Sequence, residues 1–204
     1  MLDHIILGVP ELDAGIDAFR AATGVTPVRG GRHPGRGTEN ALVALGDGTY
    51  LELIAPVPGE APDSEFLTFL RQLARPTPVG WALRVKDAAA ARERLSRDGY
   101  AVTAVNAGSR LTPSGEKLEW DTFELTQFQT PAAPFFIAWR DMSKHPSRSA
   151  PSGCTIARFD LADPAAATLS AALRHAGFDP TIAVAEKTAM ALSLRCGDHA
   201  VTFE

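Results

Sequence analysis

The sequence predicts an α+β fold in which repeated units of one strand, one helix and further strands pair into a cupped, mostly antiparallel sheet. The order of strand, helix and strands occurs three times along the chain. The expected helices end at Gly24, Gly99 and Gly177, which are 75 and 78 residues apart, and such a regular spacing is typical of a repeated supersecondary unit. One unit cannot bury the face of its own sheet, so we expect the units to pair around a hollow that holds a small ligand.

The first unit begins with a short apolar run that predicts a strand. Apolar side chains at helical spacing then predict a helix, and a Gly-Asp-Gly turn signal separates two later strands. The expected elements are a strand over Leu2–Val9, a helix with Leu12, Ile16, Phe19 and Ala22 on its apolar face, extended segments at Thr26–Arg29 and Ala41–Leu45, and a strand over Tyr50–Ala55.

The same order returns twice more. A connecting helix with Phe66, Leu67, Phe69, Leu70 and Leu73 precedes the second unit, whose helix is capped by Asp87. In the third unit, Asp163 is expected to cap a helix with Pro164 at its first position. The expected strands are Val79–Val85, Ala101–Val105, Lys117–Thr126 and Phe135–Arg140 in the second unit, and Thr155–Leu161, Thr181–Ala185, Thr188–Arg195 and His199–Phe203 in the third.

Composition narrows the class of protein. The chain of 204 residues is 45% hydrophobic and 22% charged with a formal charge of -4, which excludes wholesale disorder and argues against a nucleic-acid partner. No apolar run approaches the ~18–20 residues that span a membrane, and the N-terminus lacks the basic leader of a signal peptide. Cys154 and Cys196 are too few for a disulfide scaffold, so we expect two reduced core thiols in a cytoplasmic protein whose partner is a small molecule.

His4 and Glu52 are the first candidate site residues. Both lie in strands whose other members are mostly apolar. A carboxylate in such a strand either faces solvent or is buried and paired. On one concave face, the two side chains could hold a divalent metal or act as a base and its orienting partner; the alternative is a sheet that carries both on its wet side.

A second candidate is the Gly- and Arg-rich segment from Arg29 to Asn40, which contains Arg32, His33 and Arg36. Its backbone donors and guanidinium groups suit a carboxylate or phosphate. It matches neither a phosphate-binding loop nor a dinucleotide fingerprint, and the alternative is a mobile surface hairpin.

A third candidate group contains Arg110, Trp120, Trp139 and His145. Aromatic residues at strand ends often line a pocket, although packing in the core or at its rim is the alternative. Nucleophilic catalysis has little support, because no GxSxG elbow is present and neither cysteine has a recognisable catalytic context.

These residues resemble a known family. The segments LDHIILGVPELDAGIDAFRAATG, GGRHPGRGTEN and YLELIAP are similar to the first module of a glyoxalase-like domain of the vicinal oxygen chelate superfamily. The resemblance implies paired βαβββ modules that form a cupped sheet with helices on its outer face. It covers residues 1–150, with module 1 at about 1–57, a connecting helix at 64–75 and module 2 at about 78–142. Residues 151–204 then form an additional βαββ-type module.

In metal-dependent members, a His on the first strand and a Glu on the last strand of a module are common ligands, and His4 and Glu52 match these positions. The second module departs from the pattern, since it offers Trp81 and Ala138 where ligands are expected. This ligand set for one Zn, Ni, Mn or Fe ion is incomplete unless His33 or His145 adds a third group.

The sequence therefore predicts a glyoxalase-like enzyme of the lyase, isomerase or dioxygenase type that acts on a small anionic or oxygen-rich metabolite. His4 and Glu52 would be the metal ligands or the acid–base pair. The residues expected to bind substrate are Arg32, His33, Arg36, Asn40, Trp81, Arg110, Trp139 and His145. The alternative is a non-catalytic binding or sequestering protein that has lost the metal. Pairing of modules between chains would make a homodimer.

Overall fold

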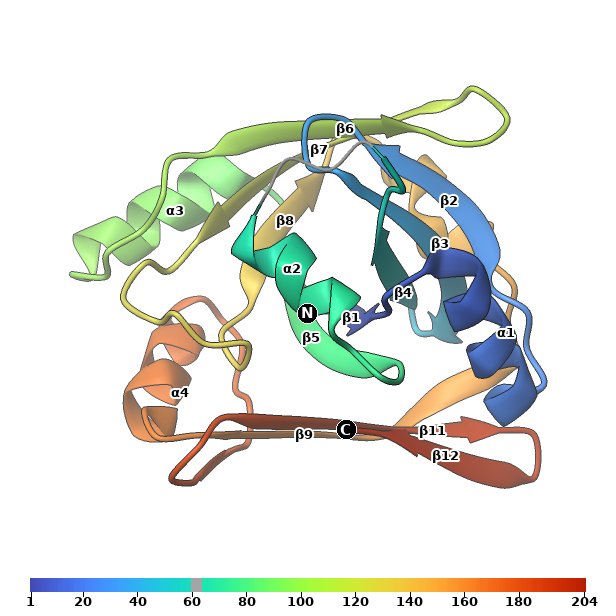
Figure 1. The fold of residues 1–204 in the computed structure, drawn as a ribbon. Coiled ribbons are helices and arrows are strands. Elements are labelled where there is room, and N and C mark those ends of the chain that lie inside the picture. Colours follow the sequence, from blue (N-terminus) through green and yellow to red (C-terminus); the bar gives the residue numbers. More distant parts are fainter. Residues whose placement is uncertain (60–63) are drawn as a thin grey trace.

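The computed structural model describes residues 1–59 and 64–204, and over these residues it confirms the α+β class and the cupped sheet (Figure 1). An eight-stranded sheet has the order β2-β3-β4-β1-β5-β8-β7-β6, and a four-stranded sheet has the order β10-β9-β11-β12. The elements of the first unit are β1 (Leu2–Gly8), α1 (Leu12–Thr23), β2 (Val28–His33), β3 (Thr38–Gly46) and β4 (Thr49–Pro56).

The second and third units repeat this order. After α2 (Glu65–Arg71), the second unit contains β5 (Thr77–Arg84), α3 (Ala88–Arg97), β6 (Asn106–Leu111), β7 (Lys117–Glu124) and β8 (Phe135–Trp139). The third unit contains β9 (Cys154–Asp163), α4 (Ala166–His175), β10 (Ile182–Val184), β11 (Ala189–Cys196) and β12 (His199–Phe203).

The large sheet is built from two equivalent halves. In each half, the first strand runs parallel to the last, as β1 does to β4 and β5 does to β8, and the halves join through the antiparallel pair β1–β5. The sheet curls until its two edges meet, where the Arg110 guanidinium on β6 donates a hydrogen bond to the Gly30 carbonyl on β2. The third unit is paired differently, because β9 lies between β10 and β11.

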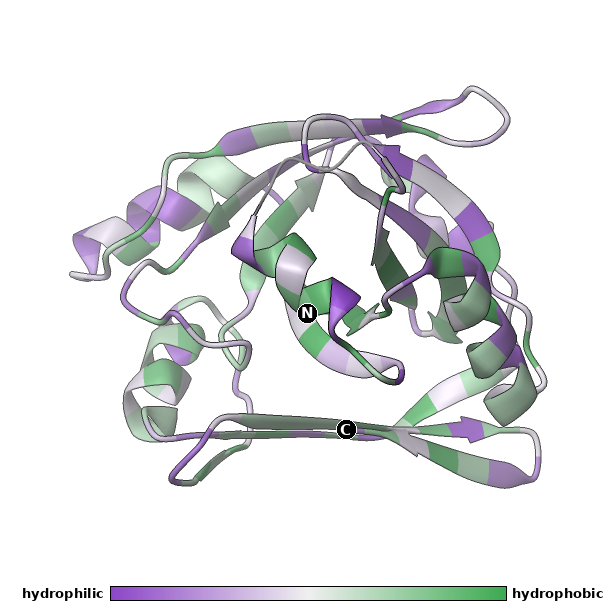
Figure 2. Cartoon of the chain, viewed as in Figure 1, coloured by the Kyte–Doolittle hydropathy of each residue, from purple (hydrophilic) through white to green (hydrophobic). Residues whose placement is uncertain are grey.

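The four-stranded sheet covers the outer face of the large sheet, and the two share one hydrophobic core (Figure 1). Residues such as Ile5, Leu51 and Leu83 from the large sheet pack in the same buried cluster as Leu192 and Leu194 from β11. Figure 2 shows β4 as largely hydrophobic, and every residue of this strand is buried. One face of β4 therefore points into the core and the other into the cup.

Two expectations from the sequence are wrong, one about a strand and one about a helix cap. The segment at Ala101–Val105 is not a strand, since within it only Val102 forms an isolated bridge; its backbone hydrogen bonds go to side chains and to the end of β7, and the edge strand follows as β6. Asp163 does not cap α4, because its carboxylate accepts hydrogen bonds from Thr130, Thr188 and the Ala165 amide, and Pro164 lies before the helix.

The expectation of reduced thiols is also wrong, because Cys154 and Cys196 form a disulfide. The two residues are direct partners in the antiparallel pair β9–β11, so the sheet register brings their side chains together. Disulfides are typical of oxidising compartments. The cytoplasmic location stays a prediction that the cysteines no longer support.

No helix among the described residues is long and apolar enough to cross a membrane.

Candidate functional site

The concave face of the large sheet encloses a cavity of about 750 Å³. The first half of the sheet contributes mostly polar side chains, and the second half contributes mostly apolar ones. Helix α2 packs across the cup through Leu67 and Leu70, which contact Ile54 on β4. The polar side chains around the cavity are His4, His33, Arg36, Thr38, Asn40, Tyr50, Glu52, Arg110, Thr122, Glu124, Thr126, Gln129 and Thr130.

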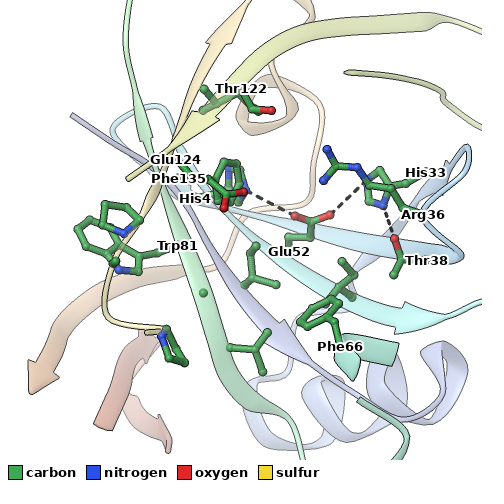
Figure 3. Close-up of a pocket in the computed structure, with 18 of the residues that line it drawn as sticks. His4, His33, Arg36, Thr38, Glu52, Phe66, Trp81, Thr122, Glu124 and Phe135 are labelled. Atoms are coloured by element: carbon green, nitrogen blue, oxygen red, sulfur yellow. Dashed lines mark hydrogen bonds and ion pairs between the residues drawn. The ribbon is translucent and has the colours of Figure 1, made fainter. Parts of the chain in front are cut away.

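The Glu52 carboxylate lies at the centre of the polar side chains (Figure 3). His4 Nε2 is 3.5 Å from Glu52 Oε2, and His33 Nε2 is 3.6 Å from Glu52 Oε1. Asn40 Nδ2 donates a 2.6 Å hydrogen bond to Oε1. The structure thus brings the two residues of the predicted acid–base pair together on the concave face and adds a second imidazole.

Asp3 orients His4 from behind. The register between β1 and β5 shifts between Leu2 and His4, so a β-bulge places Asp3 next to His4 instead of on the opposite face of the sheet. Such bulges re-aim side chains near active sites. The fully buried Asp3 carboxylate is 2.7 Å from His4 Nδ1, and a proton on that nitrogen directs Nε2 towards Glu52.

His145 supports Asp3 and does not line the cavity. The Ser147 amide hydrogen-bonds to His145 Nδ1, and His145 Nε2 donates to Asp3 Oδ2 over 3.1 Å. Trp139 Nε1 donates to the same carboxylate, with N–O distances of 3.2 and 3.4 Å. Trp139 also borders the cavity, so it links the network around Asp3 to the ligand space.

Arg110 presents a buried positive charge to the cavity. Only 4% of the residue is exposed, and no carboxylate of the described residues lies within ion-pair distance of its guanidinium. Arg36 borders the cavity but is exposed. Arg32 points away from the cavity lining and has an ion pair with Glu39, with 3.8 Å between Nε and Oε2. Among the three predicted arginines, Arg110 is therefore the one built into the site.

His33 and Asn40 complete the polar end. His33 Nδ1 is 2.9 Å from Thr38 Oγ1, and the neighbouring turn gives Arg36 and Thr38 their places beside it (Figure 3). Among the described residues, Asn40 Oδ1 is the one buried side-chain oxygen or nitrogen without a hydrogen-bond partner. A buried acceptor without a partner is costly, and Oδ1 lies against Gly30, where a side-chain Cβ would collide with it.

The pKa values of the polar residues follow from this arrangement. Burial alone would raise the pKa of Glu52. At the acidic pH where a carboxyl titrates, however, the charges of His33 and His4, the Asn40 hydrogen bond and Arg110 together lower its pKa below the usual value. These surroundings keep Glu52 ionised. Burial lowers the pKa of His33, so this imidazole is neutral at pH 7, and burial raises the pKa of Tyr50 well above its usual value.

Trp81 and Ala138 do not occupy positions equivalent to ligands. Trp81 pairs with Ile5, whose side chain is in the core, whereas His4 pairs with Ala82. Paired residues of neighbouring strands share one face, so Trp81 points out of the cup and borders the cavity only from behind. Its indole donates to the Ala132 carbonyl over 3.0 Å, and Ala138 is likewise part of the outer core.

The concave positions of the second half are apolar. Gly80, Phe135 and Ile137 face the cavity where the first half carries His4 and Glu52. Among residues 1–59 and 64–204, no group of three His, Cys, Asp or Glu side chains has the arrangement that holds a metal ion. One Glu52 oxygen also already accepts the Asn40 hydrogen bond. The donor set therefore does not fit the metal centre that the family resemblance implies.

Sequence reasoning missed Asp3, Tyr50 and Glu124. Tyr50 stacks on His4, with ring centroids 4.6 Å apart, and Glu124 lines the cavity from β7. The alternation of strand residues could have placed Tyr50 beside Glu52. No feature of the sequence predicts the bulge that places Asp3 beside His4.

Comparisons with known proteins agree with this architecture. The family described as "Glyoxalase-like domain" matches residues 2–177. A hypothetical protein from Staphylococcus aureus has a similar structure, with a TM-score of 0.67 and 18% identity, over 99% of this chain and 84% of that chain. This likeness shows the fold alone, and its coverage includes the C-terminal sheet.

Methylmalonyl-CoA epimerases have structures similar to part of the chain. The enzyme from Mycobacterium tuberculosis has a TM-score of 0.49 and 21% identity, over 68% of this chain and 85% of that chain. The Streptomyces coelicolor enzyme has a TM-score of 0.48 and 17% identity, over 69% and 97%. No curated protein sequence matches the chain.

Proposed function

The chain belongs to the glyoxalase-like domain family, and on this premise we propose that it is an acid–base enzyme of the isomerase or lyase type. In this proposal it moves a proton at the carbon next to a carbonyl group in a small anionic substrate. The observation that carries the proposal is Glu52, a carboxylate that is only 6% exposed yet faces the cavity between two imidazoles. The cavity also holds Arg110, which forms no ion pair with a carboxylate of the part of the chain that the structure describes.

Glu52 is the proposed general base. Its lowered pKa keeps it ionised at neutral pH, so it can accept a proton without first losing one. Positioned bases of this kind contribute about 10²–10⁴-fold to rate. The Asp3–His4 pair holds one imidazole against the carboxylate, and the neutral His33 lies on its other side. Either imidazole is close enough to stabilise or relay the transferred proton.

Arg110 is the proposed electrophilic group. Removing a proton next to a carbonyl places negative charge on the carbonyl oxygen, and a fixed positive charge in a site with little water stabilises that oxyanion. Glu52 and Arg110 interact electrostatically in the free protein. When Glu52 accepts the proton, its charge is neutralised and the new negative charge forms on the substrate beside Arg110. The proton then returns to the substrate, or a leaving group departs.

The rival is a binding protein of the same fold. The apolar concave positions of the second half favour it, since Gly80, Phe135 and Ile137 offer surface for binding and no group for chemistry. Both functions predict an anionic ligand in the cavity. They differ in whether Glu52 exchanges a proton with that ligand.

Proton exchange with solvent tests the proposal without knowledge of the product. The protein is incubated in D₂O with a panel of 2-oxo acids, hydroxy ketones and 2-methyl-branched thioesters, and NMR follows loss of the proton next to the carbonyl. We expect exchange with at least one class, and we expect Glu52→Gln to slow it by about 10²-fold or more. Binding of panel members without any exchange would favour the binding protein.

A further inference from the structure

The wall of the cavity opposite its charged end is the segment of residues 126–134, called here the wall segment. It connects β7 to β8, and most of its residues line the cavity. Its cavity-lining residues are uncharged: the apolar Phe128, Pro131, Ala133 and Pro134 lie among the polar Thr126, Gln129 and Thr130. In Figure 3, Trp81 marks this side of Glu52, and His33 and Arg36 mark the other. The wall segment is therefore an uncharged side of the cavity with several apolar contacts, opposite the side with His33 and Arg36.

The wall segment is held in place from the C-terminal sheet. Thr130 Oγ1 donates a 2.6 Å hydrogen bond to Oδ2 of Asp163 at the end of β9, and Asp163 is only 2% exposed. The Ala165 amide holds the other oxygen of this carboxylate over 2.8 Å. Asp163 is thus a fixed, buried anchor whose contact with the cavity runs through Thr130.

A second tether lies two residues further along. Trp81 Nε1 donates to the carbonyl of Ala132, which is fully buried. The Trp81 ring packs between the sheets against Phe159 of β9 and Phe178 after α4, with centroid distances of 5.7 Å to each. The C-terminal sheet therefore holds one attachment point directly through Asp163 and contacts the other through the Trp81 ring of β5, and the segment between them carries no regular secondary structure.

We propose that the C-terminal residues 154–204 select the substrate, because they hold the wall segment in the shape that receives the nonpolar part of an anionic ligand. The ligand class is a small carboxylate with an aromatic or branched aliphatic body, whose charged group lies at Arg110 and whose body lies against Phe128 and Pro131. The position of the charged group rests on the proposed function. The tether to the C-terminal sheet does not.

Calorimetric titration of the whole protein with acetate and with 3-phenylpropanoate tests the proposal. We expect 3-phenylpropanoate to bind at least about tenfold more tightly, since burial of a phenyl ring is worth that much or more. Thr130→Val removes the hydroxyl that holds the wall segment and keeps the side-chain shape. The variant should bind 3-phenylpropanoate about fivefold or more weakly, and its affinity for acetate should change by less than about twofold. The loss is selective because only the contact with the apolar part of the ligand is disturbed.

Thr188→Val is the matched control. Thr188 donates a hydrogen bond of the same 2.6 Å length to the same Asp163 oxygen, and its hydroxyl lies 3.0 Å from that of Thr130. It lies outside the wall segment, and its replacement leaves the Thr130–Asp163 bond in place. Its preference for 3-phenylpropanoate should equal that of the wild type. If Thr130→Val does not fold, Trp81→Phe removes the other tether and should show the same selective loss.

Two results would overturn the proposal: equal affinity of the wild-type protein for the two carboxylates, or equal loss of preference in Thr130→Val and Thr188→Val. Failure of the proposed function looks different. A protein that exchanges no protons but shows the selective loss in Thr130→Val would be a binding protein with the wall described here. If Glu52→Gln loses proton exchange but Thr130→Val changes neither affinity, the proposed enzyme function stands and the proposed role of the C-terminal sheet is wrong.

Discussion

Replacement of Asp3 with Asn tests whether the network behind His4 holds the site together. Asp3 is fully buried, and its two oxygens accept hydrogen bonds from His4, His145 and Trp139. Asn keeps the shape but replaces one accepting oxygen with an NH₂ group. That group then faces donors, so the variant loses the bonds on one side whichever way the amide is turned.

The size of the effect follows from the bonds that are lost. A hydrogen bond to a charged group contributes about 1.5–3 kcal/mol. If the Asn oxygen keeps the bond from His4, the bond from His145 is lost and Trp139 keeps only its 3.4 Å contact with Oδ1, which gives a decrease of about 2–4 kcal/mol in the free energy of unfolding. Removal of one partner from a buried ion pair costs a similar amount.

The pH dependence gives a second check. The buried Asp3 carboxyl pays a desolvation cost, but hydrogen bonds from His145 and His4 lower its pKa below the ordinary 3.8. Its contribution to stability is therefore present above pH 3.8 and is lost as the pH falls further, through the folded-state pKa. Urea unfolding at pH 7 and pH 3 should show a smaller difference between wild type and Asp3→Asn at the lower pH. A loss below about 1 kcal/mol at pH 7 would refute this reasoning, because it is less than one charged hydrogen bond.

Three further predictions concern the charged end and the C-terminal sheet. Arg110→Met should weaken 3-phenylpropanoate binding by about tenfold or more in calorimetry, whereas Met at the exposed Arg20 should have no effect; equal affinities would remove Arg110 from the site. Burial lowers the pKa of His33, so an NMR titration should show this imidazole gaining its proton below pH 6.5. The folded protein should lose stability as the pH falls below 6.5. A titration midpoint above pH 6.5 would contradict the burial of His33. Replacement of Cys154 and Cys196, which are 42 residues apart, with Ser should lower the unfolding free energy by about 4 kcal/mol on the chain-entropy estimate; no change between oxidised and reduced wild type would contradict the disulfide.

The sequence predicted much of this arrangement from strand periodicity and helix-ending glycines. His4 and Glu52 lie on the concave face as the resemblance implied, because successive side chains of a strand point to opposite faces of the sheet and both residues lie in strands that the sequence predicted. Trp81 shows the limit of that approach. A shift of one residue in a period of two moves a side chain to the opposite face, and the sequence does not set the register of β1 against β5.

The parts that the sequence did not predict depend on contacts between distant segments. The bulge at Asp3 arises where β1 pairs with β5, and the Cys154–Cys196 disulfide arises where β9 pairs with β11. Asp163 looked like a helix cap because its neighbours suit one, yet its carboxylate bonds Thr130 and Thr188 instead. In each case a long-range pairing decided the local role.

The role of Glu52 is tested most directly by the rate of proton exchange in wild type and Glu52→Gln, measured in D₂O with one anionic carbonyl compound that both proteins bind with equal affinity. We expect exchange to fall by about 10²-fold or more in the variant, because the buried carboxylate that accepts the proton is gone. Equal exchange rates at equal occupancy would show that Glu52 is not the base.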